Sequence, residues 1–317
     1  MRTYIIRRIL LVVPTLFLVT IIVFAVVRMI PGDVIDVLMS EMSELGTSVD
    51  RERIMQMLGL DLPVHVQYGR WIGGVLQGDL GTSLRGSVPI TPKILARLPV
   101  TLELGVFAVI IGLLIALPIG IYSAIRQNTI SDYAGRGIAV TFISVPTFWT
   151  STMVMIFPAL WWGWAPSVRL IPFTQDPLGN LGMFLLPATI LGTVLSGTTM
   201  RMTRTMALEV LRQDYIRTAW SKGLREKIVV LRHVLKNALI PVVTIVGFQL
   251  PILIGGSVII EQIFVLPGLG TLLLDSISKR DYPIISGINL FFATAVVLIN
   301  LLIDLTYAFL DPRVRYR

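Results

Sequence analysis

The chain has 317 residues, of which 54% are hydrophobic and 15% are charged, and its mean hydropathy is +0.79. Because soluble domains carry about a quarter charged residues, this composition excludes a water-soluble globular protein and predicts a single membrane domain over residues 1–317. The absence of cysteine excludes disulfides and thiolate metal sites. The two histidines, His65 and His233, lie too far apart in the sequence to predict a metal site.

Apolar stretches long enough to span a membrane dominate the chain, since the hydrocarbon core is about 30 Å thick and a helix rises about 1.5 Å per residue. In chain order they cover residues 9–27, 101–125, 137–160, 181–199, 238–260 and 283–303. We therefore predict an all-α, polytopic membrane protein with about six transmembrane helices. The first stretch follows Arg7 and Arg8 but lacks a small-residue cleavage site, so we interpret it as an anchor and not as a signal peptide.

Basic residues predict the orientation, because Lys and Arg near helix ends resist translocation. With the N-terminus inside, the cytoplasmic segments hold most of the 27 Lys and Arg residues, while the two short outer loops hold only Arg169, Lys279 and Arg280. The net charge of +8 thus matches membrane topology better than nucleic-acid binding. Both termini are predicted to be cytoplasmic.

Residues 31–99 would form an extracytoplasmic loop region that is too long for a simple turn. Ile54 and Leu58 lie at helical spacing before Gly59, a typical helix stop, and predict a small helical region there. Such a region either shields the ends of the membrane helices or docks a soluble partner, and the sequence leaves both open.

A polar, strongly basic segment at residues 201–236 separates the fourth and fifth apolar stretches. Apolar residues at helical spacing between Ala207 and Ala219, and again between Ile228 and Leu235, predict two short helices joined by a turn at Gly223. Such a segment could bind anionic lipid headgroups. Alternatively, it forms a rigid cytoplasmic handle for a protein partner.

The residues of this segment carry a family resemblance. The run DYIRTAWSKGL at 214–224, followed by RHVLKNALIP at 232–241, resembles the cytoplasmic coupling loop of ABC-importer permeases, above all the dipeptide and oligopeptide branch. Arg217 and Thr218 stand where the general importer pattern has Glu and Ala, whereas Ala219 and Gly223 agree with it. Further motifs similar to this branch are PGD at 31–33, GDLG at 78–81, TLEL at 101–104, PGLG at 267–270, RDYP at 280–283 and DPRVRY at 311–316.

The resemblance implies a permease subunit of the bacterial inner membrane that imports di- or oligopeptides. The implied partners are a second, distinct permease chain, two ATP-binding subunits that hold ATP and Mg, and an extracytoplasmic solute-binding protein. It also leaves open nickel chelates, glutathione or oligosaccharides as cargo. The residues it implies for coupling to the ATPase are Asp214, Tyr215, Arg217, Thr218, Ala219, Lys222 and Gly223.

The chain itself is not expected to be an enzyme or to hold a cofactor. A phosphate-binding loop ends in Gly-Lys-Ser/Thr, and no Gly-Lys pair occurs in the sequence. A gradient-driven secondary transporter is the alternative class, but we expect the membrane helices to lack buried ionisable residues, and no inverted repeat is evident. We expect Glu103, near the start of the second stretch, to cap or pack that helix.

Polar residues on the apolar stretches are candidates for a translocation pathway, because a polar group facing lipid lacks partners. Each could equally make a hydrogen bond between helices. These residues are Ser196, Thr198, Thr244, Gln249 and Asn289.

Overall fold

The computed structural model describes residues 2–29, 35–36, 39, 50–86, 88–165 and 170–310. Arg169 and the motifs at 31–33 and 311–316 lie outside these residues. Within the described ranges the chain forms helices and turns, with one isolated antiparallel bridge between Thr82 and Pro89. This confirms the all-α fold.

Two compact units make up the fold, each assembled from separate parts of the sequence. The first unit comprises residues 1–8, 99–271 and 298–317, and the second comprises residues 9–98 and 272–297. The larger apolar core belongs to the first unit and is centred on Leu104, Phe184 and Leu191. A smaller cluster around Ile54 belongs to the second.

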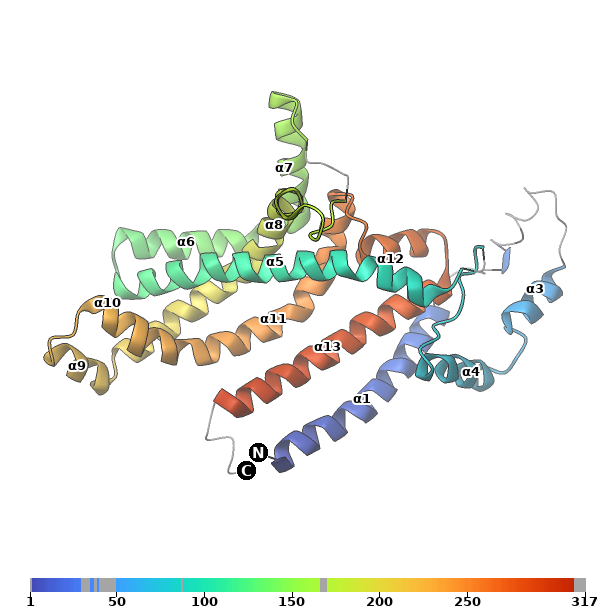
Figure 1. Cartoon of the computed structure of the whole chain (residues 1–317), viewed down its shortest axis with the longest axis horizontal. Helices are drawn as coiled ribbons and strands as arrows, with labels where there is room; N and C mark the ends of the chain where they lie inside the picture. The colour runs from blue at the N-terminus through green and yellow to red at the C-terminus, as the bar shows by residue number, and fades with distance from the viewer. Residues whose placement is uncertain are drawn as a thin grey trace. The chain divides into compact units, whose positions relative to one another are not determined.

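Five helices in the described ranges are long and apolar enough to cross a membrane. They are α1 (Arg2–Arg28), α5 (Ile90–Ile125), α8 (Pro177–Leu211), α11 (Leu235–Ile263) and α13 (Tyr282–Leu310) (Figure 1). Each contains one predicted stretch, so those five predictions are confirmed. Because α5 begins at Ile90, Glu103 lies inside the helix and does not cap it, so that this part of the expectation is wrong.

The third predicted stretch, 137–160, is broken into α6 (Ile130–Ser144) and α7 (Thr147–Trp162), which are bent by 94° (Figure 1). The prediction of a single continuous helix is wrong here. Pro146 disfavours helical geometry at the residue before it, and Val145 accordingly adopts the extended conformation, with φ −84° and ψ 121°. In the part of the chain that the structure describes, the candidate membrane spans therefore number five, or six if the bent pair counts as one span.

The α5 and α8 helices approach closely along a row of glycines in the first unit. A Cβ atom on Gly192 would lie 2.6 Å from the carbonyl oxygen of Ala108, and one on Gly112 would lie 2.9 Å from the carbonyl oxygen of Gly192. Small residues allow this backbone contact, which is a common source of helix association in membranes. The pair forms the frame on which α6, α7 and α11 pack.

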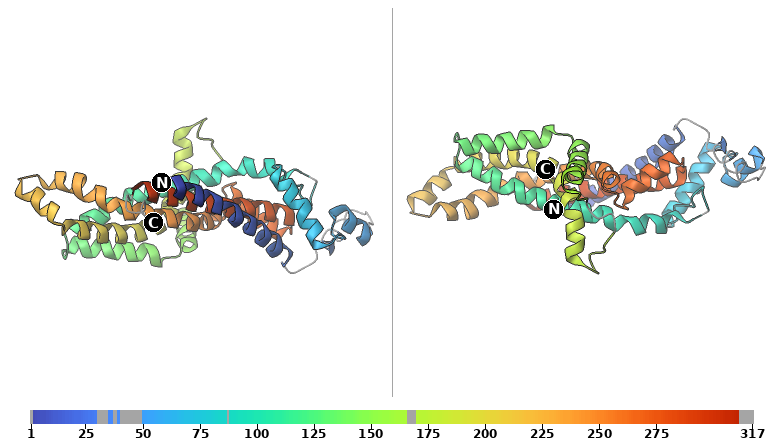
Figure 2. Two further views of the ribbon diagram at one scale, coloured as in Figure 1. Left: turned by 90° about the horizontal axis from the view of Figure 1, so that it is seen from below. Right: turned by 90° about the horizontal axis from the view of Figure 1, so that it is seen from above.

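The segment between α8 and α11 differs in part from its prediction. Residues 201–211 continue α8, so the first short helix is only α9 (Asp214–Ser221). The predicted turn at Gly223 is present, with φ +76°. The second predicted helix is not separate, because α10 (Glu226–Ile228) and the π-helix η1 (Val229–Val234) continue directly into α11. Figure 2 shows α9 and α10 at the tip of the α8–α11 pair.

The second unit contains the helical region predicted within residues 31–99. Helix α3 (Arg51–Leu58) ends at Gly59, whose φ of +65° confirms the predicted stop, and α4 (Val64–Leu76) follows. The buried Asp281 accepts hydrogen bonds from the Ser83 hydroxyl and the Leu84 backbone N–H. This carboxylate therefore fastens the loop after α4 to the start of α13.

Candidate functional site

Helix α9 is amphipathic and is held by one apolar face. Ile216 is fully buried and Ala219 is nearly so, and both pack in a cluster with Ala207 of α8, Val234 of η1 and Ala238 of α11. The cluster joins α9 to both long helices that flank it. Because Ala219 lies inside this cluster, it anchors the helix and cannot itself offer a contact surface.

The other predicted residues of α9 lie on its exposed face. Asp214 and Arg217 are exposed and form an ion pair of 3.3 Å, and the Thr218 hydroxyl donates to the carbonyl oxygen of Asp214. Exposed pairs of this kind contribute about 0.3–0.5 kcal/mol, so they hardly stabilise the helix. Their side chains are available to a partner.

Large apolar side chains are also exposed on this tip. Tyr215, Trp220 and Ile228 are each more than 40% exposed, and Leu231 is 53% exposed. The Tyr215 hydroxyl accepts a 3.1 Å hydrogen bond from the amide of Asn237 on α11, which holds the ring in place. Clustered exposed apolar groups with a polar rim are typical of protein interaction sites.

Gly223 ends the α9 segment through its backbone conformation. Its N–H donates to the carbonyl oxygen of Trp220 at 2.8 Å, and its φ of +76° lies in the left-handed region. A Cβ atom at this position would meet nothing within 4 Å. The glycine is therefore required by the turn and not by any close neighbour.

The tip is strongly basic. Its exposed basic residues outnumber the exposed acidic residues Glu209, Asp214 and Glu226. The basic residues are Arg212, Arg217, Lys222, Arg225, Lys227, Arg232 and Lys236. An acidic surface is the complementary partner for this charge.

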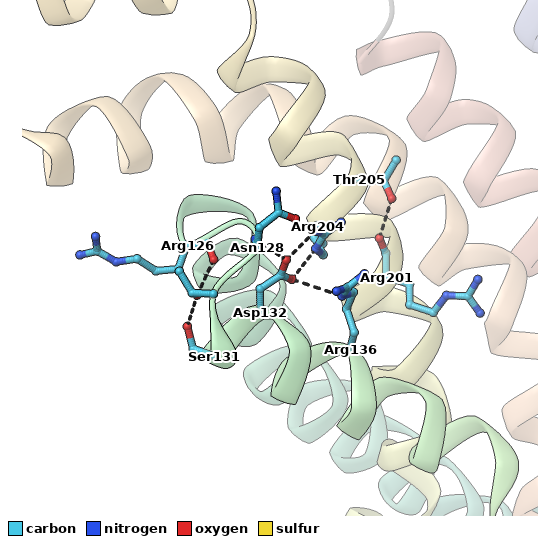
Figure 3. Close-up of polar contacts among 9 residues, drawn as sticks. Arg126, Asn128, Ser131, Asp132, Arg136, Arg201, Arg204 and Thr205 are labelled. Atoms are coloured by element: carbon cyan, nitrogen blue, oxygen red, sulfur yellow. Dashed lines mark hydrogen bonds and ion pairs between the residues drawn. The ribbon is translucent and has the colours of Figure 1, made fainter.

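A buried ion pair that the sequence did not reveal lies near the base of this tip (Figure 3). Asp132 of α6 is fully buried and pairs with Arg204 of α8 through two contacts of 2.7 Å. The backbone N–H of Asn128 donates to the same carboxylate at 3.0 Å. The two residues are 72 positions apart in the sequence, so no local pattern could have paired them.

A second buried carboxylate, Glu261, lies at the end of α11. It accepts hydrogen bonds from the Thr101 hydroxyl and from the backbone N–H groups of Gly270 and Thr271, in the first turn of α12 (Leu269–Ser278). The expectation that the membrane helices lack buried ionisable residues is thus wrong for Asp132 and Glu261. Both lie just beyond the limits of the apolar stretches, where the hydropathy pattern gave no reason to expect burial.

The predicted pathway residues of the first unit have different surroundings. Ser196 is buried and donates to the carbonyl oxygen of Thr193 in its own helix, whereas Thr198 is exposed. Gln249 donates at 3.2 Å to the hydroxyl of Thr199, which links α11 to α8. A hydrogen bond between helices is the alternative role expected for each candidate, and the described contacts show such a bond at Gln249.

Thr244 and Asn289, the remaining pathway candidates, are both half-buried. Thr244 lines a mostly apolar cavity of about 210 Å³ between α11 and the residues of α13 from 299 onward. Asn289 belongs to the part of α13 in the second unit. Of the candidates in the first unit, Thr244 lines this cavity, whereas Ser196, Thr198 and Gln249 do not.

Metal ligands do not cluster in the part of the chain that the structure describes. No group of three or more His, Cys, Asp or Glu side chains is arranged there to hold an ion. The site described above is an exposed, basic and partly apolar protein surface, held by a buried apolar face.

Comparison with known proteins places this arrangement in a family. Residues 116–316 match the family "Binding-protein-dependent transport system inner membrane component", and residues 1–105 match the N-terminal family of such membrane components. The chain belongs to this family. It is a permease subunit of an ABC importer, as the coupling-loop resemblance implied, and a gradient-driven transporter is set aside.

Full-length relatives of this importer permease are similar along their entire sequences. The "Dipeptide transport system permease protein DppB" of Escherichia coli (strain K12) is 39% identical over 341 residues, covering 100% of both chains. The "Oligopeptide transport system permease protein AppB" of Bacillus subtilis (strain 168) is 40% identical over 319 residues, again covering 100% of both.

Solved structures share the fold of the importer permease. One chain of an amino acid ABC transporter aligns with a TM-score of 0.53 at 15% identity, covering 69% of this chain and 94% of that one. A chain of the MetNI methionine ABC transporter aligns with a TM-score of 0.51 at 17% identity, covering 69% and 96%. These identities are low, so the likeness concerns the fold alone.

Proposed function

We propose that this permease subunit forms half of a translocation pathway for di- or oligopeptides and that α9 and the turn at Gly223 bind a separate ATP-binding subunit. The observation that carries the coupling proposal is the two-sided character of α9. Ile216 and Ala219 fasten it to α8 and α11, while Tyr215, Arg217 and Thr218 remain exposed. A force applied to the exposed face would therefore move the long helices.

The proposal assigns a place to each partner. ATP and Mg belong to two ATP-binding subunits that contact the basic tip within residues 201–236, and a second, distinct permease chain completes the pathway. A solute-binding protein would dock outside, where residues 31–99 include α3 and α4. Residues 1–317 then act as one permease domain in a bacterial inner membrane, with both termini cytoplasmic.

Peptide cargo is proposed because relatives about 40% identical over their whole length are named as dipeptide and oligopeptide permeases. Ser196, Thr198, Thr244, Gln249 and Asn289 remain the proposed pathway residues. Uptake of labelled di- and tripeptides by the reconstituted importer tests the cargo. Uptake of nickel chelates, glutathione or oligosaccharides in place of peptides would contradict it.

Cysteine crosslinking tests the coupling site directly, since the natural chain contains no cysteine and each introduced thiol is unique. Thr218→Cys and Lys222→Cys place thiols on exposed positions of the tip. In membranes holding the whole importer, we expect both to crosslink to the ATP-binding subunit. The buried Ala219 is a poor position for this experiment.

A matched control lies at the start of α8, the end of that helix far from the tip. Leu178, in the first turn of α8, is 82% exposed, and Leu178→Cys should not crosslink to the ATP-binding subunit. Crosslinks from Leu178 but none from the tip would contradict both the coupling site and the proposed orientation. If the thiols at the tip react only when anionic lipid is present, and do so without an ATP-binding subunit, a lipid-binding role of the tip would be favoured.

A further inference from the structure

The buried Asp132–Arg204 pair has a geometry that fixes two helices in one register. The Arg204 Nε and Nη2 atoms each lie 2.7 Å from one oxygen of the Asp132 carboxylate, and both side chains are largely buried. The more exposed Arg136 approaches the same carboxylate only to 3.7 Å. A bidentate guanidinium–carboxylate contact constrains direction as well as distance.

A second contact fixes the same interface about two turns away. A Cβ atom on Gly197 of α8 would lie 2.8 Å from the carbonyl oxygen of Ala139 on α6, so the two backbones touch there. Asp132 and Ala139 are seven positions apart, and so are Gly197 and Arg204, as expected for antiparallel helices in register. Two attachment points at this spacing prevent α6 from rotating on α8.

The ion pair lies next to the base of α9. Arg204 precedes Ala207 by less than one turn of α8, and Ala207 packs in the cluster that holds Ile216 of α9. On its other side, Asp132 accepts the N–H of Asn128 and so also holds the turn between α5 and α6. Displacement of α9 thus reaches α6 through packed atoms and one polar contact.

Apolar contacts alone would fix the position of α6 on α8 less firmly. The remaining α6–α8 interface is built from Ala139, Gly197, Met200 and neighbouring apolar side chains. Such surfaces can slide past one another while still burying apolar area. Sliding the ion pair apart would instead leave a charge buried without its partner.

Building on the proposed coupling role of α9, we propose that Asp132 and Arg204 are positioning residues for transport. Their ion pair makes α6 follow α8, so that movement of α9 is passed to α6 and to the bend at Val145 that joins α6 to α7. This role requires no contact of the pair with ATP or cargo. The pair's role is to set the amount of peptide transported per ATP hydrolysed.

The test measures peptide transported per ATP hydrolysed by the reconstituted importer carrying Asp132→Asn, Arg204→Lys or the exchange Asp132→Arg with Arg204→Asp. In the single variants we expect assembled complexes that hydrolyse ATP, with the ratio at least about five-fold lower, a typical scale for coupling between sites. The exchange should recover part of the loss, because it restores opposite charges. If Asp132→Asn does not assemble, Arg204→Lys still provides the test, because it keeps the positive charge but changes the bidentate geometry.

Asp275→Asn is the matched control, since it makes the same chemical change in an exposed pair with Lys279 on α12 and should leave the ratio unchanged. An unchanged ratio in both single variants would overturn the proposal. The proposal would also be overturned if transport and ATP hydrolysis fell only in proportion to the amount of complex. It would be overturned as well if the exchange variant assembled but transported no more peptide per ATP than the single variants.

A second measurement on the purified full chain separates this proposal from the proposed function. Nitroxide labels on Val140→Cys of α6 and Glu209→Cys of α8, both exposed, report the distance between the two helices. We expect one narrow distance distribution in the parent chain and a broader one with Asp132→Asn. Distance distributions of equal width would overturn the proposal that the ion pair fixes α6 on α8. A parent importer that moves no peptide would instead contradict only the proposed cargo and coupling.

Discussion

Glu261 accepts a 2.7 Å hydrogen bond from the backbone N–H of Gly270, and this bond closes the turn between α11 and α12. The other carboxylate oxygen accepts the Thr101 hydroxyl, and that hydroxyl oxygen accepts the Leu269 N–H. A single buried side chain therefore satisfies donors from α5 and from the start of α12. The PGLG motif at 267–270 acquires a physical reason, because side chains at its glycines would collide with Glu261.

Replacing Glu261 by alanine should destabilise the permease, because it leaves buried N–H and hydroxyl donors without an acceptor. The cost of an unsatisfied buried group is about 1–3 kcal/mol. Glu261→Gln keeps one acceptor oxygen and should cost less. Thermal unfolding in detergent measures both, and equal losses for the two variants would contradict this account of the turn.

Gly192→Ala should weaken the contact between α5 and α8. The added methyl group would lie 2.6 Å from the carbonyl oxygen of Ala108, and overpacking of this kind costs about 1–3 kcal/mol. Gly182 is the matched control, since it lies in the same helix with nothing within 4 Å of its Cβ position. Gly182→Ala should therefore be neutral or stabilising in the same unfolding assay, and a reversed order would contradict the close approach.

Gly223→Val should uncouple transport while leaving membrane insertion intact. A β-branched residue is strained at a φ of +76°, at a cost of about 1–2 kcal/mol or more, and the turn that ends α9 would rearrange. Gly223→Asn should retain more transport because asparagine tolerates the left-handed region. Peptide uptake by the reconstituted importer compares the two, and normal transport by the valine variant would count against α9 as a rigid coupling element.

Gln249→Leu should change stability by less than about 1 kcal/mol, because hydrogen bonds between membrane helices average about 0.6 kcal/mol. The lost contact is the 3.2 Å bond to the Thr199 hydroxyl. If Gln249 also faces cargo, transport should fall much more than stability does. Parallel measurement of peptide uptake and thermal unfolding distinguishes the two roles, and proportional losses would argue for packing alone.

Much of the fold follows from local sequence. Apolar runs such as 181–199 are about long enough to span the hydrocarbon core of a bilayer and lie within helices, and the stop at Gly59 and the turn at Gly223 appear where they were predicted. The reason is that chain length in a helix, hydropathy and the left-handed preference of glycine act over a few residues. The apolar pattern could not mark helix ends such as Ile90 or Leu211, because polar turns continue these helices.

The coupling segment was only partly accessible from sequence. The helical spacing of Ile216 and Ala219 indicated a helix, but it could not show that these two side chains are buried while Thr218 and Lys222 are exposed. That division depends on Ala207, Val234 and Ala238, which belong to other elements. Which face of α9 is free is therefore a tertiary property.

By itself, the sequence determined that this chain is a membrane-spanning permease of the importer family, because its solvent is lipid and its motifs extend from end to end. Only the tertiary structure decided which charges are buried. Asp132 and Arg204 are 72 positions apart, and Glu261 meets a hydroxyl 160 positions away. Neither carboxylate differs locally from an exposed one, since a buried charge is made tolerable by partners that only the packed helices supply.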